Sequence, residues 1–194
     1  MLAGREAWMQ NPDEQLVARC HAGDLDAFGQ IYARYEQQVF RYAYRLLGHK
    51  EDADDVKQET FVKAYQAISK FRNDSSLQTW LLKICGNLCR DRFKSWERRK
   101  IEYHAEYRHD LACPHSHGAD PHVLVERAER NEIVLQALHS LPLSQREIIV
   151  LHDIEERDYN EIGAILGCSP ISAKLRLFRA RRSLQDRAKS MLGN

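Results

Sequence analysis

The chain has 194 residues and a formal net charge of +1, from 29 lysines and arginines against 28 aspartates and glutamates. That length allows one large domain or two small ones. A charge balance so close to zero excludes a protein that coats nucleic acid through overall positive charge, so any anionic partner must meet a local basic surface.

Two amphipathic helices are predicted near the start of the chain. Asp24 is a candidate N-cap for the first helix, which continues to Gly48, a residue typical of helix ends. Glu51 and Asp52 open the second helix and place negative charge at the positive end of its dipole. The positions expected to face inward are Phe28, Ile31, Tyr32, Tyr35, Val39, Ala43, Leu46, Leu47, Val56, Phe61, Ala64, Tyr65 and Ile68.

A turn-forming segment at 71–76 and a third helix complete a predicted bundle over residues 12–100. The third helix starts at Leu77, keeps Trp80 on its inner stripe and runs into a basic tail at 90–100. Six basic residues stand against two acidic ones in that tail, so positive charge is segregated there.

Apolar periodicity is lost at 101–121, where prolines, glycine and histidines predict a flexible linker. Helical periodicity returns in a second domain at 122–190, in which Ser144 and Glu147 are spaced as a capping box. The sequence therefore predicts an all-α fold, with two small helical domains joined by a flexible linker.

The second domain ends in a predicted helix-turn-helix. Asp158 and Glu161 form a capping box, and Gly167 ends the short helix that follows. Ser169 is the expected N-cap of the last helix, with Pro170 at its first position, where the missing N–H costs nothing. The inward positions of this helix are Ala173, Leu177 and Ala180 or Leu184.

Basic residues cover the rest of the last helix. Between Pro170 and Arg182 there are five basic residues and no acidic one. A solvated basic face is the alternative interpretation, but such a surface repels itself unless an anion lies against it. Duplex DNA with this helix in its major groove is therefore favoured. The five residues are Lys174, Arg176, Arg179, Arg181 and Arg182.

The loop and third helix of the first bundle interleave aromatic, amide and basic side chains. Unstacked bases are held by aromatic faces and a cationic track, and amides read their edges. Asn87, Arg90 and Lys94 lie three and four residues apart, forming a polar stripe that core packing does not explain. The alternative to base stacking for Trp80 and Phe93 is that their rings belong to the hydrophobic core. This alternative is favoured for Trp80.

One cluster in the linker has the residue types of a metal site. Cys113, His115 and His117 offer thiolate and imidazole, which suit zinc or nickel. No second pair stands at a zinc-finger spacing, so solvated histidines are favoured and no cofactor is predicted. Phosphate loops and nucleophile motifs do not occur in the sequence, and we expect no enzyme.

The sequence also bears on the compartment. Five cysteines without regular spacing predict reduced thiols. The N-terminal residues show no apolar signal core, and the longest uncharged run, 133–145, is short and contains a proline. We therefore expect a cytoplasmic protein without stable membrane insertion.

Two long motifs resemble the sigma-70 family of transcription initiation factors. The stretch DADDVKQETFVKAYQAI, followed by KFRNDSSLQTWLLKICGNLCRDRFK, resembles their promoter-melting domain. The stretch YNEIGAILGCSPISAKLRLFRARRSL resembles their upstream-element reader. The resemblance covers about residues 12–100 and 123–188, and the two-domain layout is similar to the small extracytoplasmic-function (ECF) group. It implies a factor that binds core RNA polymerase, recognises −35 and −10 promoter elements and promotes melting, in a stress, envelope or metal response.

The resemblance also implies roles for single residues. Asp55, Gln58 and Glu59 match positions that dock on the clamp of the largest polymerase subunit, and further contact with the polymerase flap and a cognate anti-sigma factor is implied. The implied −10 contacts, including a pocket for a flipped base, are Phe71, Arg72, Asn73, Asp74, Asn87, Arg90 and Lys94. The implied −35 readers are Lys174, Leu175, Phe178 and Arg179, beside the basic residues Arg176, Arg181 and Arg182.

Leu175 departs from the serine that many relatives carry, and a leucine packs on a thymine methyl but cannot hydrogen-bond a base edge.

Two other functions are considered. A free-standing regulator of the LuxR type requires a ligand or phosphoacceptor domain in the N-terminal half, which the predicted bundle does not resemble. A metal sensor built on the linker histidines predicts stoichiometric retention of zinc or nickel.

Overall fold

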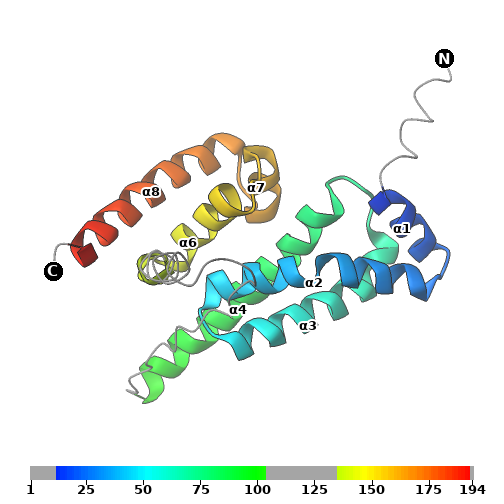
Figure 1. The fold of residues 1–194 in the computed structure, drawn as a ribbon, viewed down its shortest axis with the longest axis horizontal. Helices are drawn as coiled ribbons and strands as arrows, with labels where there is room; N and C mark the ends of the chain where they lie inside the picture. The colour runs from blue at the N-terminus through cyan, green and yellow to red at the C-terminus, as the bar shows by residue number, and fades with distance from the viewer. Residues whose placement is uncertain (1–11, 104–134, 193–194) are drawn as a thin grey trace, which may run out of the picture.

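The computed structural model describes residues 12–103 and 135–192, and the secondary structure in these residues is helical, without a strand. The predicted all-α class is confirmed. Figure 1 shows two groups of helices, α1–α4 and α6–α8. The elements are α1 (Pro12–His21), α2 (Leu25–Leu47), α3 (Lys50–Ala67), η2 (Ile68–Lys70), α4 (Leu77–Tyr103), α6 (Leu143–Ile149), η3 (Val150–Ile154), α7 (Tyr159–Leu166) and α8 (Pro170–Leu192).

Helix α2 begins and ends where its sequence predicts. The Asp24 carboxylate accepts the backbone N–H of Asp26 at 3.0 Å and of Ala27 at 3.2 Å, which satisfies donors of the first turn. Gly48 follows the helix with φ of 80°, a left-handed conformation that a residue without Cβ adopts freely. Both ends of the longest apolar stripe are thus fixed by local chemistry.

The core of the first group lies between α2, α3 and α4. Ile31, Leu46 and Leu81 are fully buried in it, as the apolar periodicity predicts. Tyr65 was expected to face inward, but it is 49% exposed and packs edge-on against the ring of Phe28 at 5.1 Å. That prediction was wrong, because Tyr65 lies at the margin of the α2–α3 contact, where an aromatic ring is only half covered.

Helix α1 was not predicted as an element. Its Asp13 accepts hydrogen bonds from the Tyr35 hydroxyl and from Arg34, so two side chains of α2 hold it in place. These polar contacts join residues more than twenty positions apart, which periodicity cannot indicate, and Leu16 and Val17 of α1 are buried in the core.

The helix-turn-helix forms as predicted. Asp158 accepts the backbone N–H of Glu161 at 2.8 Å, and Glu161 accepts the N–H of Asp158 at 3.1 Å, completing the capping box. Gly167 has φ of 66°, and the Ser169 hydroxyl accepts the N–H of Ser172 at 3.2 Å. The inward-facing residues of α8 are Ala173, Leu177 and Ala180, which are buried.

The capping box predicted at Ser144 and Glu147 does not form. Helix α6 begins at Leu143 after Pro142, without a side-chain cap. Glu147 is 1% exposed, and its carboxylate is bonded to the first helical group instead. The spacing was right for a cap, but a partner distant in sequence holds the carboxylate.

The two helical groups are in contact, with α7 against α4 and α6 against α2. Arg146 is 3% exposed and donates to the carbonyl oxygens of Leu138, His139 and Leu141, and to that of Leu46 in the last turn of α2. The predicted linker, 101–121, lies almost wholly outside the described residues, so the domain boundaries stay a prediction.

Candidate nucleic-acid interfaces

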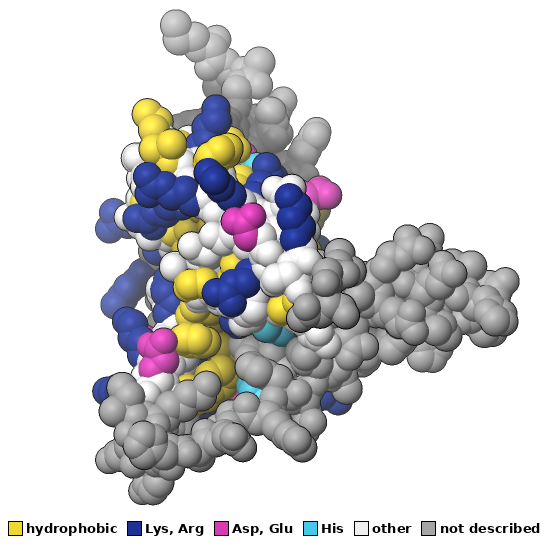
Figure 2. Space-filling view, turned by 90° about the vertical axis from the view of Figure 1, so that its left-hand side faces the viewer, with side chains coloured by type: hydrophobic (Ala, Val, Ile, Leu, Met, Phe, Trp, Pro, Cys, Tyr) yellow, Lys and Arg dark blue, Asp and Glu magenta, His cyan; other side chains and the backbone are white. Residues whose placement is uncertain are grey.

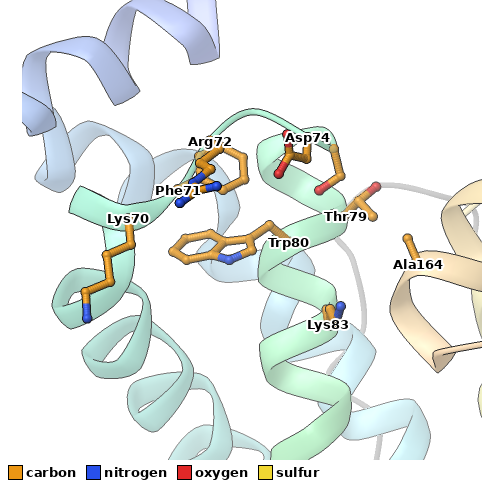
Figure 3. A pocket seen from close by; sticks show the side chains of 9 residues that line it. Lys70, Phe71, Arg72, Asp74, Thr79, Trp80, Lys83 and Ala164 are labelled. Atoms are coloured by element: carbon orange, nitrogen blue, oxygen red, sulfur yellow. The ribbon is translucent and has the colours of Figure 1, made fainter.

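A cavity of about 390 Å³ opens beside the loop that joins η2 to α4. Figure 3 shows aromatic and basic side chains around it, with α7 of the second group on the far side. Asn73 in this loop has φ of 55°, a left-handed conformation that asparagine tolerates better than most residues. The lining residues are Lys70, Phe71, Arg72, Asp74, Ser75, Thr79, Trp80, Lys83 and Ala164.

Two aromatic rings form one wall of the cavity. Phe71 and Trp80 lie 4.8 Å apart between ring centroids, tilted by 36°. Phe71 is only 7% exposed, whereas Trp80 is half-buried and borders the open space. The sequence favoured Trp80 as core, and the structure packs its ring against the core and against Phe71, but leaves it half-buried where it also lines the cavity.

The polar stripe of Asn87, Arg90 and Lys94 on α4 already makes hydrogen bonds within the protein. Asn87 and Lys94 are exposed. Arg90 lies between them and donates to the Asn87 side-chain oxygen and to the carboxylate of Glu147 in α6. The arginine of this stripe is therefore already bound by a carboxylate of the second helical group.

The outer face of α8 carries apolar and basic residues together. Ile171, Leu175 and Phe178 are 75%, 54% and 69% exposed, and their spacing of four and three residues places them in one row. Figure 2 shows Lys and Arg side chains gathered with hydrophobic ones on the face where α8 lies. The exposed basic residues of the helix are Lys174, Arg176, Arg179, Arg181 and Arg182.

Arg181 differs from the other basic residues of α8. Its guanidinium donates to Asp153 at 3.1 Å, so this side chain is turned toward η3 of its own domain. Burial raises the pKa of Asp153, but hydrogen bonds from Arg181 and His152 outweigh burial and leave the pKa below its ordinary value. Arg181 therefore also serves the packing of α8.

A third surface lies on α3. Asp55, Gln58 and Glu59 are exposed there, with Asp55 3.5 Å from Arg92 and Glu59 3.1 Å from Lys63. Gln58 also borders a groove of about 420 Å³, which sequence reasoning missed because its floor is shared between α2 and α3. The other residues of the groove are Phe28, Tyr32, Phe61, Val62, Tyr65 and Gln66.

The cluster Cys113, His115 and His117 lies outside the described residues. Within residues 12–103 and 135–192, no three histidine, cysteine or acidic side chains gather as a metal site. In the same part of the chain no helix is both long and apolar enough to cross a bilayer.

Comparison with known families assigns both helical groups. Residues 31–99 match sigma-70 region 2, and residues 131–184 match sigma-70 region 4. The ECF RNA polymerase sigma-E factor of Escherichia coli is 30% identical over 187 residues, covering 94% of this chain and 97% of that protein. The chain belongs to the ECF sigma factors. The RNA polymerase sigma-H factor of Pseudomonas aeruginosa is similar to the same extent, 30% over 187 residues.

Solved structures agree with this sigma factor assignment. RpoE from Bartonella quintana, in complex with the anti-sigma factor NepR, has a TM-score of 0.70 and 25% identity, covering 85% of this chain and 98% of that one. CnrH in complex with the cytosolic domain of CnrY has a TM-score of 0.65 and 29% identity, covering 91% and 96%. As a sigma factor, this protein is a promoter-recognition subunit of transcription initiation that binds core RNA polymerase and promoter DNA, and such factors are regulatory rather than catalytic.

Proposed function

We propose that the cavity beside the 71–76 loop receives a base of the −10 element extruded from the duplex. Trp80 offers an aromatic ring there, while Arg72 and Lys83 bring positive charge to a phosphate backbone. Extruding a base costs a few kcal/mol, which stacking and phosphate contacts offset. The cavity with its aromatic wall and cations is the observation that carries this proposal. The proposed −10 residues are Phe71, Arg72, Asn73, Asp74, Asn87, Arg90 and Lys94, with Trp80 and Lys83 added from the geometry.

Helix α8 is proposed to read the −35 element in the major groove. The exposed row of Ile171, Leu175 and Phe178 suits thymine methyl groups, because the 5-methyl is the apolar feature of that groove. Lys174, Arg176, Arg179, Arg181 and Arg182 are assigned to phosphates and base edges, with Arg181 shared with Asp153.

The exposed acidic and amide residues of α3 are proposed to contact the polymerase clamp. Gln58 borders an apolar groove, and Asp55 and Glu59 are exposed on the same helix, a combination that suits a protein partner better than an anionic nucleic acid. Contact of region 4 with the polymerase flap is proposed by family resemblance.

An anti-sigma partner and a cytoplasmic location are proposed from the relatives. RpoE was solved in complex with the anti-sigma factor NepR, and CnrH in complex with the cytosolic domain of CnrY. Sigma-E factors are also similar to this chain, so we propose a stress or envelope response as its use.

In vitro transcription tests the proposal. Core polymerase is combined with the chain on a promoter library, and we expect a shared −35 and −10 motif among the initiated templates. The Lys83→Ala variant removes a cation of the cavity, and Lys50→Ala removes an exposed lysine of α3 as its matched control. Open-complex formation should fall several-fold for Lys83→Ala only. Equal rates for both variants, or no redirected initiation, would contradict the assignment.

A further inference from the structure

A histidine, an aspartate and an arginine meet in region 4, between η3 and the middle of α8. His152 and Asp153 belong to η3, and Arg181 reaches them from α8. Nδ1 of His152 lies 2.8 Å from Oδ1 of Asp153 and 3.2 Å from a terminal nitrogen of Arg181. Arg181 also donates to both oxygens of Asp153, through Nε at 3.1 Å and through its terminal nitrogen. Each of the three side chains therefore contacts the other two.

The Nδ1 atom of His152 lies between two neighbours with opposite requirements. A ring nitrogen that carries a proton donates a hydrogen bond, and one that carries a lone pair accepts one. The ionised carboxylate of Asp153 only accepts, while the guanidinium of Arg181 only donates. Nδ1 can therefore bond to one of these neighbours at a time, and the protonation of the ring decides which one.

The two protonation states of His152 hold Arg181 differently. In the neutral ring with its proton on Nε2, Nδ1 accepts the N–H of Arg181, so His152 and Asp153 hold the guanidinium together. A proton taken from solvent onto Nδ1 reverses this, because the new N–H donates to Asp153 and the imidazolium repels the guanidinium across 3.2 Å. Histidine is the side chain that gains its charge between about pH 5 and pH 8, so the change falls near physiological pH.

The two partners of His152 keep their charge over this range. Arginine is protonated throughout. Burial raises the pKa of Asp153, but hydrogen bonds from Arg181 and His152 outweigh burial and leave the pKa below its ordinary value. Asp153 is therefore ionised wherever His152 titrates, and the histidine is the member of the cluster that changes.

The other groups near the ring do not compete for Arg181. Tyr159 of α7 contributes a neutral aromatic ring, 5.2 Å from that of His152 between centroids. The charged residues that follow along the chain are paired elsewhere, Glu155 with Arg45 and Arg157 with Glu161.

Arg181 stands where a released side chain can reach DNA. It lies three residues after Phe178 and seven after Lys174, which places it beside the exposed row of α8. Its side chain is 51% exposed, while Leu177 and Ala180 on the inner side of the helix are buried. A long cationic side chain at this position binds a duplex phosphate once the cluster no longer holds it.

We propose that His152 is a positioning residue whose protonation decides whether Arg181 is held within region 4 or given to promoter DNA. The inference rests on the proposed reading of the −35 element by α8. In acid, Arg181 is released and the holoenzyme gains one phosphate contact. The linkage is reciprocal, so DNA that binds Arg181 also favours the protonated form of His152.

The contribution of Arg181 to DNA binding at two pH values tests the inference. Holoenzymes formed with the wild type and with Arg181→Ala are titrated with a −35 duplex at about pH 8 and about pH 5.5. We expect the loss of affinity caused by Arg181→Ala to be about threefold greater in acid, which is the worth of one exposed ion pair. Arg182→Ala is the matched control, because Arg182 is the exposed neighbour and its loss should be the same at both pH values.

Two further backgrounds show which group is responsible. In His152→Gln the side chain does not titrate, so the loss caused by Arg181→Ala should not change with pH. In Asp153→Asn the carboxylate is absent, so the loss should already be large at about pH 8. A loss that does not change with pH in the wild type, or one that still grows in the His152→Gln background, would overturn the inference.

NMR spectroscopy of the full chain without polymerase or DNA separates this inference from the proposed function. The Hε resonance of Arg181 should move toward that of Arg182 in acid in the wild type, and should stay in place in His152→Gln. An unmoved resonance in the wild type would overturn the release of Arg181. If neither Arg181→Ala nor Arg182→Ala weakens −35 binding at either pH, the proposed reading by α8 fails, and the resonance alone decides the release.

Discussion

Tyr42 and Glu147 meet at the boundary between regions 2 and 4, where the phenolic O–H donates to the carboxylate across 3.2 Å. Both side chains are buried, at 0% and 1% exposure. Burial raises the pKa of both groups, and Arg90 opposes the rise by favouring the charged form of Glu147. A carboxylate enclosed in this way makes the contact between the regions sensitive to pH.

The first prediction concerns this pH dependence. Because burial raises the folded pKa of Glu147, its contribution to stability is fully present below the unfolded pKa, about 4.3, and is lost as pH rises through the folded value. Glu147→Gln does not titrate. The unfolding free energy of the wild type should therefore fall relative to Glu147→Gln between pH 4 and pH 7, as measured by urea denaturation. A relative rise would mean that the attraction of Arg90 outweighs desolvation.

The second prediction concerns Arg146, whose guanidinium donates to four backbone carbonyls. A lysine in its place has a single ammonium and leaves several of these buried oxygens without a donor. We expect Arg146→Lys to lower the unfolding free energy by about 3 kcal/mol. Arg41→Lys, at an exposed position of α2, is the control and should change it little. Similar denaturation midpoints for the two variants would contradict this role.

The third prediction separates two adjacent arginines of α8. Arg181 is tied to Asp153, whereas Arg182 is its exposed neighbour. Arg182→Ala should weaken binding of the holoenzyme to a −35 duplex more than Arg181→Ala does. The Asp153 pKa is lowered, so its stabilising effect is present above an unfolded pKa of about 3.9 and is lost as pH falls. Only Arg181→Ala should therefore reduce stability at pH 7, by about 0.5 kcal/mol or less for so exposed a pair.

The fourth prediction concerns Leu175. If it packs on a thymine methyl, replacing that thymine of the −35 element with uracil removes one buried methyl, worth about 0.8 kcal/mol or a fourfold loss of affinity. Titration of the holoenzyme with both duplexes measures the loss. Leu175→Ser should bind the two duplexes equally, and uracil in the spacer should have no effect on either protein. Equal affinities of the wild-type holoenzyme for the thymine and uracil duplexes would refute this contact.

The helix ends could be predicted because their chemistry is local. Asp24, Asp158 and Gly167 act on backbone groups within a few residues, so spacing along the chain contains the whole interaction. The exposed face of α8 is likewise set by the burial of Ala173 and Leu177 on the other side.

Two features of the fold escaped sequence analysis because their partners are distant in sequence. Glu147 is spaced as a cap, but Arg90 is 57 positions away and no local pattern reveals that it competes for the carboxylate. The same reason explains why α1, anchored on Asp13, was missed.

Glu161 uses its two oxygens in different directions. Oε2 accepts the N–H of Asp158 at the start of α7, and Oε1 accepts Thr79 of the other domain. One side chain therefore both caps α7, the first helix of the helix-turn-helix, and contacts α4 of region 2. A mutation at this position alters two properties at once, and neither can evolve there without the other.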